Sequence, residues 1–279
     1  SRSNFTVFAV LLLLSYPLFY FSYKFCLPDF GGEDYFYYQY LYNHWDFSKV
    51  PSPFNMRLLS SFFIFLMNQT GLNYDTEIVF TKVHPDFSRE VFFNAVLFNY
   101  LCVIFTCWVI YRIILRFARN SVYAFLGGSI YLFGFGTLFF SLKPLSDSCG
   151  VLLIALAFYF YLNKNNWLFL ILFLSVFQRE YVLMVFGILA CVDYYFNRIK
   201  YFVVVLGGTI LFFCVYYILR KTFFFTPHFD SQTSPVTFYN SLLNPGINWI
   251  PFIKQTILIS NLLFLYIFIL LYKRFKKLP

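Results

Sequence analysis

Long apolar runs separated by short polar segments dominate this chain. A helix needs about 20 apolar residues to cross a lipid bilayer, and most of these runs approach that length. We therefore predict membrane-spanning helices over residues 5–25, 91–115, 121–141, 149–163, 201–219 and 253–272. The fourth of these should begin nearer to Pro144, and Gly127, Gly128, Gly134 and Gly136 should allow the third to approach a neighbouring helix closely.

The composition agrees with a membrane protein. Of the 279 residues, 60% are hydrophobic and 12% are charged, whereas about a quarter of the residues in a soluble domain are charged. The formal net charge of +9 comes from basic residues scattered between apolar runs. Such charge orients a protein in the membrane rather than indicating nucleic-acid binding. No small-residue cleavage pattern follows the first run, so we interpret it as a retained helix rather than a removed signal peptide.

The first long polar segment, residues 26–90, is predicted to be an outer loop that carries two helices. Residues 33–45 follow a Gly-Gly pair and are rich in tyrosine, which suits a short helix in the lipid headgroup layer. Residues 57–67 are apolar but would span only about 16 Å as a helix, too short to cross the bilayer. We expect two outer interfacial helices here and a second outer loop over residues 220–252.

Residues 167–196 form an apolar stretch interrupted by Gln178-Arg179-Glu180, so they are one long helix or two short ones. Two short helices would leave eleven cations on the inner side with a single acid, Asp193, and ten cations outside with eleven acids. Basic inner loops are the arrangement that the positive-inside rule requires. We therefore predict two arms, eight membrane passes and both termini in the cytoplasm, with residues 1–279 forming a single transmembrane domain.

This topology places nearly every acid on one side of the membrane. Glu33 and Asp34 follow the first span, Arg57 follows the tyrosine-rich helix, and two hairpins on the same side are closed by residues 143–147 and 178–180. The four features could converge. A carboxylate can take a proton from an acceptor hydroxyl, and arginine can hold a leaving phosphate, which is the chemistry of a transferase with a lipid-phosphate donor.

Each of these residues also has a structural explanation. Glu33 and Asp34 could favour the positive end of a helix dipole, and Arg57 could extend to the headgroups. Asp147 could cap the helix that follows it, and Arg179 could pair with the adjacent Glu180. The three histidines show no spacing of metal ligands, and neither do the six cysteines.

The order of these features resembles the GT-C superfamily of membrane glycosyltransferases, especially its small bacterial members that lack a soluble domain. The resemblance covers about residues 1–200. It rests on four short motifs in sequence order, namely Gly31-Gly32-Glu33-Asp34, Pro53-Phe-Asn-Met-Arg57, Pro144-Leu-Ser-Asp147 and Gln178-Arg179-Glu180.

The resemblance implies an all-α, GT-C-like helical bundle in a bacterial inner membrane. It implies an inverting-type glycosyltransferase that moves a sugar from a polyprenyl-phosphate donor to an acceptor on the outer face of the cell envelope. The implied base is Asp34 or Glu33, and the implied substrate-binding residues are Arg57, Arg179, Glu180, Asp147, Lys143 and His44. A site of this kind could bind Mg²⁺ or Mn²⁺, although no ligand spacing indicates one.

Two other functions remain open from the sequence. The chain could be a degenerate, non-catalytic membrane subunit of a larger envelope complex, with other membrane proteins and lipids as its partners. A transporter fits less well, because the sequence shows no inverted repeat and its acids lie in loops rather than at mid-span.

Overall fold

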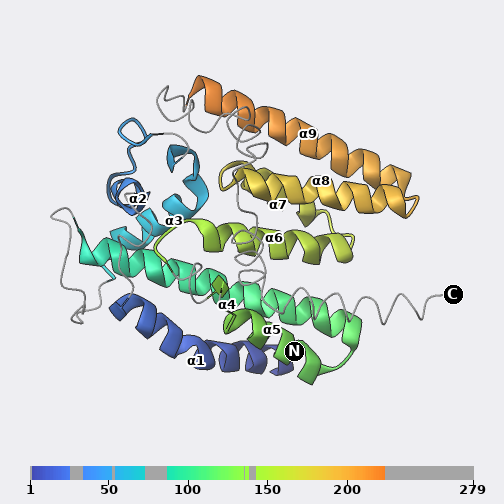
Figure 1. Cartoon of the computed structure of the whole chain (residues 1–279), viewed down its shortest axis with the longest axis horizontal. Helices are drawn as coiled ribbons and strands as arrows, with labels where there is room; N and C mark the ends of the chain where they lie inside the picture. The colour runs from blue at the N-terminus through green and yellow to red at the C-terminus, as the bar shows by residue number, and fades with distance from the viewer. Residues whose placement is uncertain are drawn as a thin grey trace, which may run out of the picture.

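The computed structural model describes residues 2–25, 34–51, 54–72, 87–134, 136–137 and 143–223, and all regular structure in those ranges is helical (Figure 1). The elements are α1 (Arg2–Phe25), α2 (Asp34–His44), the 3-10 helix η2 (Phe54–Met56), α3 (Leu58–Gln69), α4 (Arg89–Ala118), α5 (Ser121–Leu132), α6 (Asp147–Leu162), α7 (Trp167–Val176), α8 (Glu180–Tyr195) and α9 (Ile199–Thr222). The prediction of an all-α protein is confirmed for this part of the chain.

Three of the described helices are long and apolar enough to cross a membrane. They are Phe5–Phe25 of α1, Arg89–Ala118 (α4) and Ile199–Thr222 (α9), and they match three of the predicted spans. The helices α3, α5, α6 and α7 are apolar but shorter. The predicted span over residues 253–272 and most of the predicted loop over residues 220–252 lie outside the described residues. The described helices thus establish three candidate spans.

Helix α4 lies at the centre of the first half of the bundle (Figure 1). It contacts α1, α5 and α6, and α2 and α3 lie near its first turns. Aromatic side chains fill the contact with α1, where the ring of Phe19 lies 5.0 Å from that of Tyr100. Close packing of these rings stabilises the contact, because lipid provides no hydrophobic driving force between membrane helices.

The second half of the bundle confirms the prediction that residues 167–196 form two arms. Helix α7 ends at Val176 and α8 begins at Glu180, and the two helices pack against each other. A buried cluster that includes Leu172, Val182 and Phe186 joins them to α6 and α9. Helix α9 covers α7 and α8 at the edge of the bundle (Figure 1).

Of two predicted helix ends, one differs from the structure and one agrees with it. Helix α5 ends at Leu132, so the single helix predicted over residues 121–141 is interrupted there; residues 136 and 137 are helical again, and residues 138–142 lie outside the described residues. Gly134 lies in the interruption, and glycine disfavours a helix more than any residue except proline. Helix α6 begins at Asp147, two residues before the apolar run and nearer to Pro144, as expected.

The tyrosines of α2 are a correction to the prediction of an interfacial belt. The helix is present, but Tyr35, Tyr38 and Tyr42 are fully buried. Their spacing of three and four residues places them on one helix face, and Tyr38 and Tyr42 pack in a cluster with Ile64 of α3. This face of α2 therefore belongs to the protein core.

Helices α4 and α5 approach each other closely at Gly128, as the sequence predicted. The Cys107 thiol donates a hydrogen bond of 2.8 Å to the Gly128 carbonyl oxygen. A Cβ atom at position 128 would lie 3.2 Å from the backbone oxygen of Cys107, which is tighter than an ordinary contact.

We predict that Gly128→Val lowers the free energy of unfolding by about 1–3 kcal/mol, because overpacking forces two helix backbones apart. The matched control is Gly207→Val in α9, where nothing lies within 4 Å of the added Cβ. Thermal unfolding in detergent would measure both variants. Equal unfolding temperatures for the two would contradict this account of the α4–α5 contact.

Candidate functional site

Five charged residues from separate elements gather at one end of the bundle. We call them the carboxylate–arginine cluster: Asp34, Arg57, Asp147, Arg179 and Glu180. Asp34 begins α2, Arg57 precedes α3, Asp147 begins α6, and the last two join α7 to α8. Each of the other four charges acts on the pKa of Arg57. The structure therefore brings together residues that the sequence separates by up to 146 positions.

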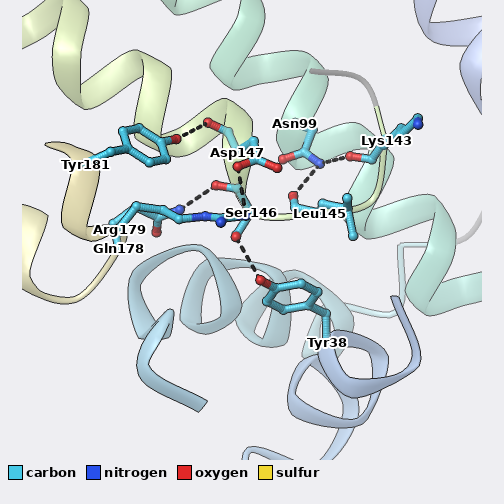
Figure 2. A network of polar contacts seen from close by, with 9 residues as sticks. All are labelled: Tyr38, Asn99, Lys143, Leu145, Ser146, Asp147, Gln178, Arg179 and Tyr181. Carbon is cyan, nitrogen blue, oxygen red and sulfur yellow. Dashed lines mark hydrogen bonds and ion pairs between the residues drawn. The ribbon is translucent and has the colours of Figure 1, made fainter. Parts of the chain in front are cut away.

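Arg179 and Asp147 form an ion pair, with 2.8 Å between Nη2 and Oδ1 (Figure 2). Ser146, rather than Asp147, is the N-cap residue of α6, and it makes no side-chain capping bond, so the capping interpretation of Asp147 is wrong. The pairing of Arg179 with its sequence neighbour is wrong as well, because Glu180 instead accepts a hydrogen bond of 3.4 Å from the Tyr216 hydroxyl of α9.

Arg57 is buried, with only 8% of its surface exposed, and does not extend to the surface. Its guanidinium carbon lies 5.2 Å from the ring of Phe54 and 5.5 Å from that of Tyr38, so both rings stabilise the cation. Desolvation, followed by the charge of Arg179, lowers the pKa of Arg57 to about 10, and nearby carboxylates oppose that shift. The side chain stays positively charged at neutral pH.

Asp34 is a half-buried carboxylate in the same cluster. Burial raises the pKa of Asp34, and the positive charges of Arg57 and Arg179 offset only part of that effect. A carboxylate with a raised pKa is a stronger base than an ordinary aspartate, because basicity follows the pKa of the conjugate acid. Its sequence neighbour Glu33, the other candidate base, lies outside the described residues.

A buried glutamine joins the helix ends that carry these charges (Figure 2). Gln178 is 1% exposed. Its Nε2 donates to the Ser146 carbonyl oxygen at 2.5 Å, and its Oε1 accepts from the Ser60 backbone N–H at 3.1 Å. Next to the glutamine, the Leu59 backbone N–H donates a hydrogen bond of 2.9 Å to the Phe177 carbonyl oxygen. The α7–α8 junction is thereby tied to the first residues of both α6 and α3.

Further polar contacts hold the segment before α6 (Figure 2). The Ser146 hydroxyl donates to the Tyr38 hydroxyl at 3.2 Å. Asn99 of α4 donates to the carbonyl oxygens of Leu145, at 2.8 Å, and Lys143. Sequence reasoning missed Tyr38 and Asn99 and named Gln178 in a motif without giving it a role, although an asparagine inside an apolar run is a sign of a buried polar contact.

Two of the predicted substrate-binding residues lie apart from the cluster. The side chain of Lys143 points away from the Arg179–Asp147 pair (Figure 2). His44 is exposed at the last residue of α2, with its ring 4.7 Å from that of Tyr40. Ten residues of helix separate His44 from Asp34, a distance of about 15 Å. Within the described ranges, no three His, Cys, Asp or Glu side chains are grouped as metal ligands.

Comparison of this chain with protein-family models, with characterised proteins and with solved structures gave no match. The candidate site therefore rests on the geometry and charges of this chain alone.

We predict that Gln178→Leu lowers the free energy of unfolding by about 2–4 kcal/mol, because it leaves the Ser60 N–H and the Ser146 carbonyl buried without partners. The control is Ser60→Ala, which removes a buried hydroxyl that has no hydrogen-bond partner in the described part of the chain and keeps the backbone N–H. Chemical denaturation in detergent would compare the two. A loss as large for the serine variant would refute the role of the glutamine.

Proposed function

We propose that the chain is a GT-C-like glycosyltransferase that moves a sugar from a polyprenyl-phosphate donor to an acceptor on the outer face of the membrane. The observation that carries this proposal is the carboxylate–arginine cluster. It combines a half-buried carboxylate of raised pKa, Asp34, with two arginines whose charges act on it, Arg57 and Arg179. The two kinds of group that sugar transfer needs, a carboxylate base and cationic side chains that can hold a phosphate, lie in the same cluster.

In the proposed reaction, the Asp34 carboxylate takes the proton of the acceptor hydroxyl as its oxygen attacks the anomeric carbon of the donor. The bond between that carbon and the phosphate oxygen breaks, and its electron pair leaves with the phosphate. Arg57 and Arg179 stabilise the negative charge that develops on the leaving group. A single displacement of this kind inverts the configuration of the sugar.

The ion pair between Arg179 and Asp147 has a role in this proposal. Asp147 holds the Arg179 guanidinium at one edge, and a guanidinium has five donors, so other edges can face a phosphate. The Nε atoms of Arg57 and Arg179 are buried without a hydrogen-bond partner in the described part of the chain. Donors of this kind favour an anion that supplies acceptor oxygens.

We also propose that the chain is an integral protein of a bacterial inner membrane that it crosses eight times, with both termini in the cytoplasm. The distribution of charge between the two ends of the bundle supports it. The end opposite the cluster, which we call the basic end, carries cations on α4 and just after it, in the turns before α7 and α9, and in the first turn of α9 (Figure 1). These cations are Arg112, Arg116, Arg119, Lys164, Arg198 and Lys200, against the single described acid Asp193.

We expect Asp34→Asn to reduce sugar transfer by about 10²–10⁴-fold, which is the usual contribution of a general base. The control is Asp46→Asn, since Asp46 belongs to the same outer segment but only binds Ser48 and Tyr40. Transfer of a radiolabelled sugar from a polyprenyl-phosphate donor would be measured with each variant. Wild-type protein that binds the donor but transfers nothing would support the non-catalytic subunit instead.

The pH dependence of transfer provides a further test. Because the pKa of Asp34 is raised, we expect kcat/KM to fall on acidification at a pH above the ordinary aspartate value of about 3.9. Arg57→Gln removes a charge that lowers this pKa, so the acid limb should move to higher pH. A profile whose acid limb stays in place in this variant would contradict the assignment of the base.

A further inference from the structure

A cavity of about 200 Å³ lies at the basic end, far from the carboxylate–arginine cluster. It lies between the turn that joins α6 to α7 and the turn that joins α8 to α9, next to the first turn of each following helix. The polar and charged side chains that line it are Tyr161, Lys164, Asn165, Asn166, Asp193, Arg198, Lys200 and Tyr201.

The charges around this cavity leave two cations without a counterion. Asp193 is 1% exposed, and its Oδ1 accepts a hydrogen bond of 2.6 Å from Tyr161 and lies 3.7 Å from Nη1 of Arg198. Arg198 and Asp193 therefore neutralise each other. Lys164 and Lys200 form no ion pair with any other described residue, so the cavity has a net positive charge and attracts an anion.

Two features of the cavity determine which chemical groups a ligand must carry. Helix α9 begins here, and its N-cap residue Arg198 makes no side-chain capping bond, so the positive end of the helix favours an anion. The Oδ2 atom of Asp193 is buried without a hydrogen-bond partner in the described ranges, and it needs a donor. A ligand with both a phosphate and a hydroxyl group meets the two requirements.

The rim of the cavity is apolar on the side of α9. Tyr201 and Val204 line the cavity and are 47% and 53% exposed. Helix α9 is one of the three candidate membrane spans, so its exposed apolar face is suited to lipid. A lipid bound here has its charged headgroup in the cationic cavity and its acyl chains against the apolar face of α9.

We infer that this cavity binds the phosphate of a phospholipid headgroup, with Lys164 and Lys200 on the phosphate and Asp193 accepting a headgroup hydroxyl. This binding does not depend on the glycosyltransferase function. Phosphatidylglycerol carries both groups, whereas phosphatidylcholine carries a compensating cation and has no hydroxyl or N–H donor on its headgroup.

The test uses the full-length protein purified in detergent, with its thermal unfolding midpoint followed during titration with phosphatidylglycerol, phosphatidylcholine of the same acyl chains, or inorganic phosphate. We expect phosphatidylglycerol to raise the midpoint more than phosphatidylcholine does. Each of Lys164→Gln and Lys200→Gln should weaken this binding about fivefold, and the two together roughly 30-fold, from the usual contribution of one cation at a lipid surface.

The matched control is Arg119→Gln, which removes one exposed cation from the same end of the bundle but outside the cavity. Its binding of phosphatidylglycerol should equal that of the wild type. A stabilisation by inorganic phosphate as large as that by the lipid would support a phosphate site that is filled from solution. A lipid effect that survives in the double lysine variant, or that is lost equally in Arg119→Gln, would overturn the inference.

Discussion

One buried amide fixes the geometry of the carboxylate–arginine cluster. Gln178 bonds to the backbone of Ser146 and of Ser60, which lie at the start of two other helices. A buried amide must satisfy both its donor and its acceptor, so those helix ends have one favourable arrangement. Arg179 follows directly in sequence and therefore meets Asp147 at 2.8 Å. The hydrogen bonds of Gln178 to the backbone thus act together with the Arg179–Asp147 ion pair to hold these helix ends.

Because the cluster is partly buried, its charges interact strongly with one another. Two arginines face three carboxylates, so the described cluster has no excess of positive charge with which to attract an anion. Under the proposed function, a phosphate would therefore compete with the carboxylates for the guanidinium groups of Arg57 and Arg179. Desolvation strengthens that competition, since charges in a low-dielectric site interact more strongly than in water. The rings of Phe54 and Tyr38 keep Arg57 charged without occupying its hydrogen-bond donors.

The sequence predicts the elements of this fold better than their contacts. Apolar length was enough to predict α1, α4 and α9, because these depend on local composition, whereas the two arms were predicted from the balance of charge between the inner and outer loops. The burial of Tyr38 could not be predicted, since a tyrosine-rich helix suits either a membrane interface or a core. The bond between Ser60 and Gln178 joins residues 118 positions apart, and local pattern carries no information on such a partner.

The two ends of the bundle differ in how their charges are compensated, and this difference determines what each can bind. At the cluster, every described charge has an opposite charge acting on it, so a ligand there must replace an existing interaction. At the basic end, the buried Asp193 is already paired with Arg198, while Lys164 and Lys200 have no such partner among the described residues. An anion can bind to the lysines without breaking any contact. A ligand at the basic end therefore adds to the existing contacts, whereas a ligand at the cluster must exchange with them.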